Sequence, residues 1–258
     1  MPASSPARLL EAFRLDRNHY VYLIGAGGKT SLMFALARAL AGDGHAVLTT
    51  TSTRIRVPGP GESGSVVAAP LSPGLAARLR GELGEHRHVT AAPGLDSDGQ
   101  KLRGFTPAQL DTLFDGRVAE YLLVEADGAA GRSLKAHREH EPVVSDRADL
   151  VIVVVGADCL GAPLDDEHVH RAALLGERLG LAPGSPVRVE DVAALCFHPE
   201  GYLARAGAAR ELIVFLNKVA TAEQTEQGGR LAEALQSRDA AGRINAIVIG
   251  DVKSGVVL

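Results

Sequence analysis

A short run of glycine and alanine precedes a lysine and a threonine near the beginning of the sequence. Small side chains leave the backbone N–H groups of such a run free to surround a phosphate, and a following helix adds a favourable dipole. The lysine supplies a point charge, and the threonine hydroxyl lies where a phosphate-bound Mg²⁺ needs a ligand. We therefore expect a phosphate-binding loop formed by Gly25, Ala26, Gly27, Gly28, Lys29, Thr30 and Ser31.

The glycine spacing of this loop is two residues shorter than in the usual Walker motif, Gly-x-x-x-x-Gly-Lys-Thr, and is similar to that of the Mur ligases. Context supports the interpretation, because an apolar run precedes the loop and a helical pattern follows it. An incidental lysine in a glycine-rich turn is the structural alternative. A Rossmann dinucleotide site is disfavoured, because Thr30 replaces the third glycine and the second strand ends in Thr49, Thr50 and Thr51 without an acidic residue.

Two carboxylates follow another apolar run, in the sequence Tyr-Leu-Leu-Val-Glu-Ala-Asp-Gly. Glu125 and Asp127 lie where a Walker-B carboxylate holds Mg²⁺ directly or through water. We expect one to bind the metal and the other to orient water. Lys29, Glu125 and Asp127 then form the catalytic set, and Thr30, Glu125 and Asp127 are the metal ligands. The alternative is a polar strand end followed by an Asp-Gly turn.

Basic and histidine residues follow these carboxylates within residues 128–142. If this segment covers the phosphates, Arg132 and Lys135 neutralise their charge and belong to the binding site. A solvated loop is the alternative. His137 and His140 form a weak metal pair at best, because Pro142 is close and no further ligand is evident.

Polar residues also close two other predicted strands. The hydroxyls of Thr49 to Thr53 either reach metal or phosphate or simply belong to a β-strand, which favours β-branched residues. Asn217 and Lys218 stand where GTPases keep Asn-Lys-x-Asp to read guanine, and we expect them to frame a base. Because Ala220 occupies the position of that aspartate, ATP and GTP both remain open as ligands.

Five short apolar runs are continuous rather than alternating, which is typical of strands buried on both faces of a parallel sheet. A further strand over Ala46–Thr50 comes soon after the first. Helical patterns separate the strands, so we predict an α/β fold with a doubly wound, mostly parallel sheet, a P-loop NTPase-like three-layer sandwich. The five runs are Val21–Ile24, Tyr121–Val124, Leu150–Val155, Leu212–Leu216 and Ile244–Ile249.

Helix start signals are clear at several places. Capping boxes begin at Thr106 and Thr221, and Asp165 with Asp166 is expected to open a helix through about Leu179. We expect residues 1–258 to form a single P-loop-type α/β domain, with a less certain inserted segment at about 57–105. The first part of that segment is rich in Gly, Pro, Ser and Ala and fits either a flexible loop or a small strand-helix insertion.

Composition excludes several classes of function. The 258 residues are 46% hydrophobic and 22% charged, as in ordinary globular proteins, and the formal charge of -4 without charge blocks disfavours nucleic acid as a partner. The longest apolar run is far shorter than the roughly 20 residues that span a bilayer, and the opening 16 residues do not resemble a signal peptide. Two distant cysteines suit a reducing compartment. These features indicate a cytoplasmic protein without membrane contact.

Motifs over nearly the whole chain resemble one known family, the selenium-dependent hydroxylase accessory proteins called YqeC. The resemblance implies a P-loop-type nucleotide-binding protein, assigned largely by gene association to maturation of selenium-dependent molybdenum hydroxylases. The chain departs from the family at Ala220, where aspartate is frequent. The matching segments are GAGGKTS, TTTSTRI, VEADGAAGRSLKAHREHEPV, GADCLGAPLDDEHVHR, FHPEGYL and VFLNK.

Three functions fit these observations. The first is a Mg²⁺-dependent accessory protein that binds ATP or GTP, a slow NTPase whose partner is a molybdenum hydroxylase or its cofactor. The second is an ATP-dependent kinase or ligase acting on a small cofactor, as the Mur-like loop spacing allows. The third is a non-catalytic nucleotide-binding module that keeps the phosphate site without the chemistry.

Overall fold

The computed structural model describes residues 5–257, so residues 1–4 of the opening segment lie outside it. Its main element is a nine-stranded sheet in which β13 (Val256–Val257) pairs antiparallel at one edge and the other eight strands run parallel. Their spatial order is β12 (Ala246–Asp251), β11 (Glu211–Asn217), β9 (Leu150–Gly156), β1 (Tyr20–Gly25), β7 (Tyr121–Glu125), β2 (Val47–Thr51), β5 (His88–Ala92) and β4 (Ser65–Ala68).

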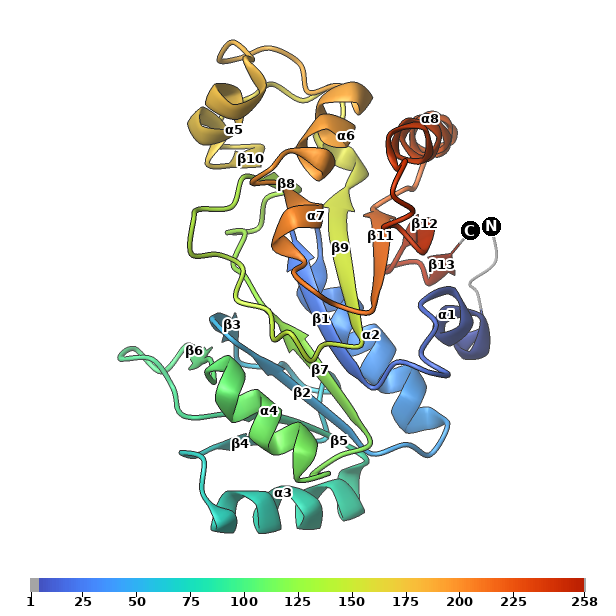
Figure 1. The fold of residues 1–258 in the computed structure, drawn as a ribbon. Helices are drawn as coiled ribbons and strands as arrows, with labels where there is room; N and C mark the ends of the chain where they lie inside the picture. The colour runs from blue at the N-terminus through green and yellow to red at the C-terminus, as the bar shows by residue number, and fades with distance from the viewer. Residues whose placement is uncertain (1–4, 258) are drawn as a thin grey trace.

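Helices cover both faces of this sheet and complete three layers (Figure 1). The helices α1 (Pro6–Ala12) and α2 (Lys29–Gly42) pack on one face. The other face carries α3 (Pro73–His86), α4 (Pro107–Asp115), α6 (Val189–Phe197), α7 (Tyr202–Arg205) and α8 (Ala222–Arg238). The predicted α/β fold with a doubly wound, mostly parallel sheet is confirmed.

The strand sequences explain the two cores. All seven residues of β9 are buried, and their side chains alternate between the faces of the sheet. Val151, Val153 and Val155 enter the core beneath α6, α7 and α8, whereas Ile152 and Val154 enter the core beneath α2. A strand that is apolar on both sides is stable only where helices cover both faces, which is why these runs read as continuous rather than alternating.

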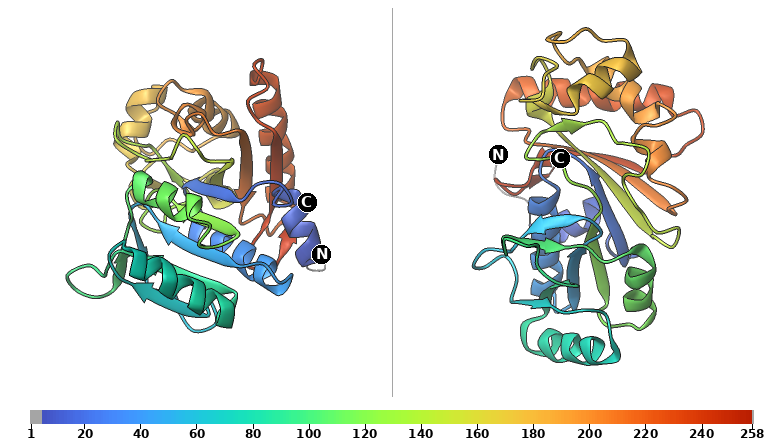
Figure 2. Two further views of the ribbon diagram at one scale, coloured as in Figure 1. Left: turned by 60° about the horizontal axis from the view of Figure 1, so that its bottom comes forward. Right: turned by 90° about the vertical axis from the view of Figure 1, so that its left-hand side faces the viewer.

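The segment at residues 57–105 contributes two strands to the main sheet. The parallel strands β4 and β5 flank helix α3, whose Leu75, Leu79 and Leu83 pack into the core. Two further strands, β3 (Arg54–Arg56) and β6 (Lys101–Arg103), pair with each other in a separate antiparallel ribbon. Figure 2 shows this part of the molecule, in cyan and green, next to the strand β2.

The helix expected from Asp165 begins later in the structure. Asp165 Oδ1 instead accepts the N–H groups of Glu167 and His168, and the chain then forms β10 (Val169–His170). This strand pairs in parallel with β8 (Leu134–Lys135), and α5 (Ala172–Leu179) starts only after it. The prediction was wrong because side-chain turn bonds and a tertiary strand pair outweigh the local helical pattern. Asp166 still contributes, since its Oδ1 accepts the N–H of Ala172.

The remaining short helical element is η1 (Ala157–Cys159), a 3₁₀ turn directly after β9. The expected strand over residues 244–249 lies two residues later, because the N–H groups of Arg243 and Ile244 bond to Asp239 in a turn. In the part of the chain that the structure describes, every helix is too short or too polar to cross a membrane.

His88 makes the stability of this sheet depend on pH. The residue is 4% exposed at the start of β5, its Nε2 lies 3.0 Å from Thr49 Oγ1, and burial lowers its pKa to about 4. The unfolded chain takes up this proton below about pH 6.5, whereas the folded protein resists it until about pH 4, so acid favours unfolding. Between pH 7 and pH 5 this group should lower the free energy of unfolding by about 2 kcal/mol.

Urea unfolding of His88→Gln at pH 7 and pH 5 should show a difference in the free energy of unfolding that is smaller than in the original chain by about 2 kcal/mol. His86→Gln, an exposed histidine at the end of α3, is the matched control and should keep the pH dependence of the original chain. An unchanged pH dependence in His88→Gln would contradict the assignment.

Candidate functional site

A cavity of about 410 Å³ opens at the carboxyl edge of the parallel strands, where ligands of open α/β sheets collect. The end of β1 lies at its centre, between the ends of β7 and β9. Its lining carries two carboxylates, Glu125 and Asp251, and a larger set of cations, which are Lys29, Arg54, Arg56, Lys101, Arg132, Lys218 and Lys253. This excess of positive charge suits an anionic ligand.

The loop after β1 divides into a fixed part and an open part. The N–H groups of Gly25, Ala26 and Gly27 donate to the Asp127 carboxylate and to the carbonyls of Val154 and Arg132. By contrast, the four N–H groups of residues 28–31 have no acceptor among the described residues, and α2 begins there without a side-chain cap. Unpaired amides at a helix start are the groups that bind phosphate.

Two glycines allow the loop to approach the neighbouring strands closely. At Gly27, with φ +90°, an added Cβ would lie 2.3 Å from the Gly156 nitrogen at the end of β9. At Gly28, with φ +114°, it would lie 2.4 Å from the side-chain nitrogen of Asn217. Both the left-handed backbone and the lack of space require glycine here.

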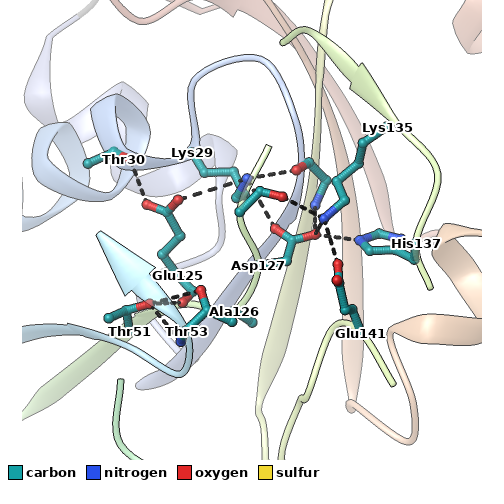
Figure 3. Close-up of polar contacts among 12 residues, drawn as sticks. Lys29, Thr30, Thr51, Thr53, Glu125, Ala126, Asp127, Lys135, His137 and Glu141 are labelled. Atoms are coloured by element: carbon teal, nitrogen blue, oxygen red, sulfur yellow. Dashed lines mark hydrogen bonds and ion pairs between the residues drawn. The ribbon is translucent and has the colours of Figure 1, made fainter. Parts of the chain in front are cut away.

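Lys29 lies between the two predicted carboxylates (Figure 3). Its Nζ donates to the Gly25 carbonyl at 2.7 Å, lies 3.0 Å from Asp127 Oδ1 and lies 3.9 Å from Glu125 Oε1. The contact with Asp127 is an ion pair without hydrogen-bond alignment, so Oδ1 has no aligned donor although it is buried. The structure therefore brings together the three residues predicted to be catalytic.

Asp127 lies at the centre of a buried charge cluster rather than in the cavity. Its Oδ2 accepts the Gly25 N–H at 3.0 Å, lies 3.2 Å from Lys135 Nζ and contacts His137 Nε2. Burial by itself raises the pKa of this carboxyl, but Lys29, His137 and Lys135 outweigh burial and hold the pKa well below its usual range. This geometry suits the positioning of Lys29 and the loop better than the predicted contact with a metal.

Glu125 faces the open part of the loop. Its Oε2 accepts a hydrogen bond of 2.6 Å from Thr30 Oγ1, and both residues line the cavity. Burial raises the pKa of Glu125, and Lys29 and Thr30 only partly oppose this effect. A buried carboxylate that lacks a full counter-charge, beside a hydroxyl, fits a hard cation such as Mg²⁺. Among residues 5–257 no three acidic, histidine or cysteine side chains form a metal cluster, so other ligands would come from phosphate or water.

The two cations predicted to bind phosphate in residues 128–142, Arg132 and Lys135, lie in different environments. Lys135 is completely buried outside the cavity, where its Nζ bonds to the Gly128 carbonyl at 2.7 Å and to Glu141 at 3.1 Å. The hydroxyl of Tyr202 donates to the Lys135 carbonyl and accepts its N–H, which fixes β8 in the core. Arg132 does line the cavity, and its Nε donates to a backbone carbonyl at 2.7 Å.

Asn217 and Lys218 both border the cavity, but their polar groups are already engaged. Asn217 Nδ2 donates to the Gly27 carbonyl at 2.7 Å, and its Oδ1 accepts the Val252 N–H at 3.0 Å. Lys218 Nζ donates to the hydroxyl of Ser133 at 2.6 Å. Asn217 therefore braces the loop after β1, and its contact with a base stays a prediction.

The threonines at the end of β2 serve the sheet. Thr50 and Thr51 donate to the carbonyls of Ala91 and Glu125 at 2.8 and 2.7 Å, and Thr49 bonds across to β5. Of the two interpretations of this cluster, the structure favours the strand role. Thr51 nevertheless matters for the site, because it fixes the backbone of Glu125 (Figure 3).

Sequence reasoning missed several residues that line the cavity. Arg54 and Arg56 alternate with a buried isoleucine directly after the threonines, an amphipathic pattern that marks a half-exposed strand. Lys253 follows the last parallel strand. It could have been predicted, because ligands bind at the carboxyl ends of parallel strands. Lys101 had no such signal, because it enters the cavity only through the pairing of β6 with β3.

Comparison with known proteins gives one family and two relatives. The sequence profile of a family described as YqeC protein matches residues 21–173. The uncharacterized protein YqeC of Escherichia coli (strain K12) is 33% identical over 235 residues, which cover 90% of this chain and 87% of that protein. The hydrogenase maturation factor HypB of Archaeoglobus fulgidus superposes with a TM-score of 0.40 and 15% identity, covering 97% of this chain and 89% of that chain.

Replacing Asn217 by alanine tests its bracing role. The change leaves the Gly27 carbonyl and the Val252 N–H without partners, so the free energy of unfolding should fall by about 1–3 kcal/mol in urea titrations. Binding of ATP and of GTP should weaken by the same factor. Lys218→Ala is the control and should change stability by less than about 0.5 kcal/mol. A selective loss of one nucleotide with full stability would instead identify Asn217 as a base-reading residue.

Proposed function

The chain belongs to the YqeC family, and from this and the geometry of the cavity we propose that it binds Mg²⁺ with ATP or GTP and slowly hydrolyses the nucleotide. The observation that carries the proposal is the set of four amides at residues 28–31 that find no acceptor within residues 5–257, next to the Lys29 ammonium and the Thr30–Glu125 pair. Together these groups offer hydrogen-bond donors, a cation and oxygen ligands to one polyphosphate.

Each residue has a distinct part in this proposal. The amides of residues 28–31 bind phosphate oxygens, and the ammonium of Lys29 moves from the Gly25 carbonyl toward the terminal phosphates. Thr30 and Glu125 would hold Mg²⁺, which offsets phosphate charge when it is bound. Asp127 orients the Lys29 ammonium through the buried ion pair. Arg132 adds positive charge to the lining of the cavity.

For the biological role, we propose that nucleotide turnover assists the maturation of a selenium-dependent molybdenum hydroxylase. The motifs shared with the YqeC family support this role, and the partner would be the hydroxylase or its cofactor. Nucleotide turnover that rises when apo-hydroxylase is added, without a new small-molecule product, would be the expected behaviour of such an accessory protein.

A kinase or ligase acting on a small cofactor is the second candidate. One observation favours it, namely that Arg54, Arg56 and Lys101 place further positive charge in the cavity, in addition to the groups of the phosphate loop. Product analysis separates the two candidates. A transferase makes a phosphorylated or ligated small molecule, whereas an NTPase yields only the nucleoside diphosphate and phosphate.

Lys29→Ala tests the phosphate site. Loss of one or more charged hydrogen bonds, about 1.5–3 kcal/mol each, should weaken the binding of ATP and GTP by roughly ten-fold or more. Calorimetric titrations with both nucleotides, with and without Mg²⁺, measure this change. Arg78→Ala, an exposed change on α3, is the control and should bind like the original chain. Equal affinity in Lys29→Ala would refute the proposed site.

The metal ligands are tested by Thr30→Val, which keeps the shape of the side chain and removes its hydroxyl. We expect Mg²⁺ to strengthen nucleotide binding in the original chain and in Thr30→Ser, but to have little effect in Thr30→Val and Glu125→Gln. Affinity measured in EDTA should be similar for all four proteins. A full Mg²⁺ effect in Thr30→Val would show that the metal binds elsewhere.

A further inference from the structure

The ribbon formed by β3 and β6 is the wall of the cavity beyond Glu125. Figure 1 shows the two strands side by side past the end of β2. Ile55 and Leu102 are the buried central residues of the two strands and pack into the core that contains α2. The exposed residues on either side are all basic, and Arg54, Arg56 and Lys101 line the cavity.

The pairing of the ribbon sets like charges against each other. Arg54 is opposite Arg103, and Arg56 is opposite Lys101. Arg56 forms an ion pair with Glu62, whereas the other three cations form no ion pair among the described residues. Like charges directly opposite in an antiparallel pair are destabilising. Positions that cost stability in this way are typical of functional surfaces, here a surface suited to an anion.

The ribbon lies on one side of the expected nucleotide. Thr30 and Glu125 would hold the Mg²⁺ that offsets the charge of the terminal phosphates, so we place the end of the polyphosphate beside this pair. Glu125 ends β7, and the ribbon continues from β2, the next strand beyond β7. Asn217 ends β11 and Lys253 follows β12, on the other side of β1 from the ribbon. The nucleoside therefore extends toward β11 and β12, and the ribbon faces the terminal phosphate and the space beyond it.

We propose that this ribbon binds a second ligand, a phosphorylated small molecule, whose phosphate contacts Arg54 and Lys101 beside the terminal phosphate of the nucleotide. The inference rests on the proposed nucleotide site. Arginine is suited to this role because its planar group donates two parallel hydrogen bonds to a phosphate. The ligand phosphate would also offset the repulsion between the paired strands.

The test uses Arg54→Gln and Lys101→Gln, with Arg103→Gln as the matched control on the same ribbon but outside the cavity lining. Each protein is first saturated with Mg²⁺ and a non-hydrolysable ATP analogue, and is then titrated with inorganic phosphate or ribose 5-phosphate. The original chain and Arg103→Gln should bind a probe, and the two cavity variants should bind it at least ten-fold more weakly. Absence of binding by the original chain, or equal binding by all variants, overturns the inference.

A second measurement separates ligand binding from a structural role. At low ionic strength and without ligand, Arg54→Gln and Arg103→Gln should melt at the same temperature as the original chain or about 1 °C higher, because repulsion is relieved. A clear fall in melting temperature would indicate a structural role and contradict the inference.

Nucleotide titrations distinguish the two proposals. If Arg54→Gln weakens binding of the ATP analogue more than binding of ADP while probe binding is unchanged, the ribbon contacts the nucleotide itself. The inference of a second ligand then fails, but the proposed nucleotide site stands. If the original chain binds no nucleotide, the proposed function fails, and the second site fails with it.

Discussion

The buried ion pair between Lys29 and Asp127 is the interaction on which the rest of the site depends. Neither charge is stable away from water without a partner, so each fixes the segment that carries the other. Asp127 also holds the Gly25 N–H and the side chains of Lys135 and His137. One carboxylate thereby joins the loop after β1, the end of β7 and the strand β8. The loop is set in place before a ligand arrives, which lowers the entropic cost of binding.

The backbone N–H groups of the loop after β1 fall into two sets. The first three N–H groups donate to acceptors within the protein, and the next four, at the start of α2, have no acceptor among the described residues. The two acidic residues divide in the same way, because Asp127 is neutralised by cations in the interior whereas Glu125 faces the cavity with its pKa raised by burial. Two carboxylates separated by one residue thus have opposite environments, one built for structure and one open to a cation.

Much of the fold follows from local sequence. Continuous apolar runs such as residues 150–155 predict strands buried on both faces, and the glycine-rich loop with Lys29 stands out because a strand and a helix enclose it. No local signal predicts that Asp127 and Lys135 are buried outside the cavity. Their positions depend on tertiary packing, such as the pairing of β8 with β10. The same holds for Asn217, whose bond to the Gly27 carbonyl spans 190 residues. Spacing along the chain identifies candidate groups, but tertiary pairing decides which of them face the cavity.

The brace formed by Asn217 also has a consequence for the order of events during synthesis. Residues 25–31 leave the ribosome long before Asn217, whose Nδ2 donates to the Gly27 carbonyl, and before Val252, whose N–H donates to Asn217 Oδ1 just after β12. Until Asn217 and Val252 have been translated, β11 and β12 are incomplete at this edge of the sheet, and the loop after β1 lacks the side chain that braces it. The nascent chain therefore cannot assemble the complete cavity, whose lining includes Val252 and Lys253, before translation has passed the last parallel strand.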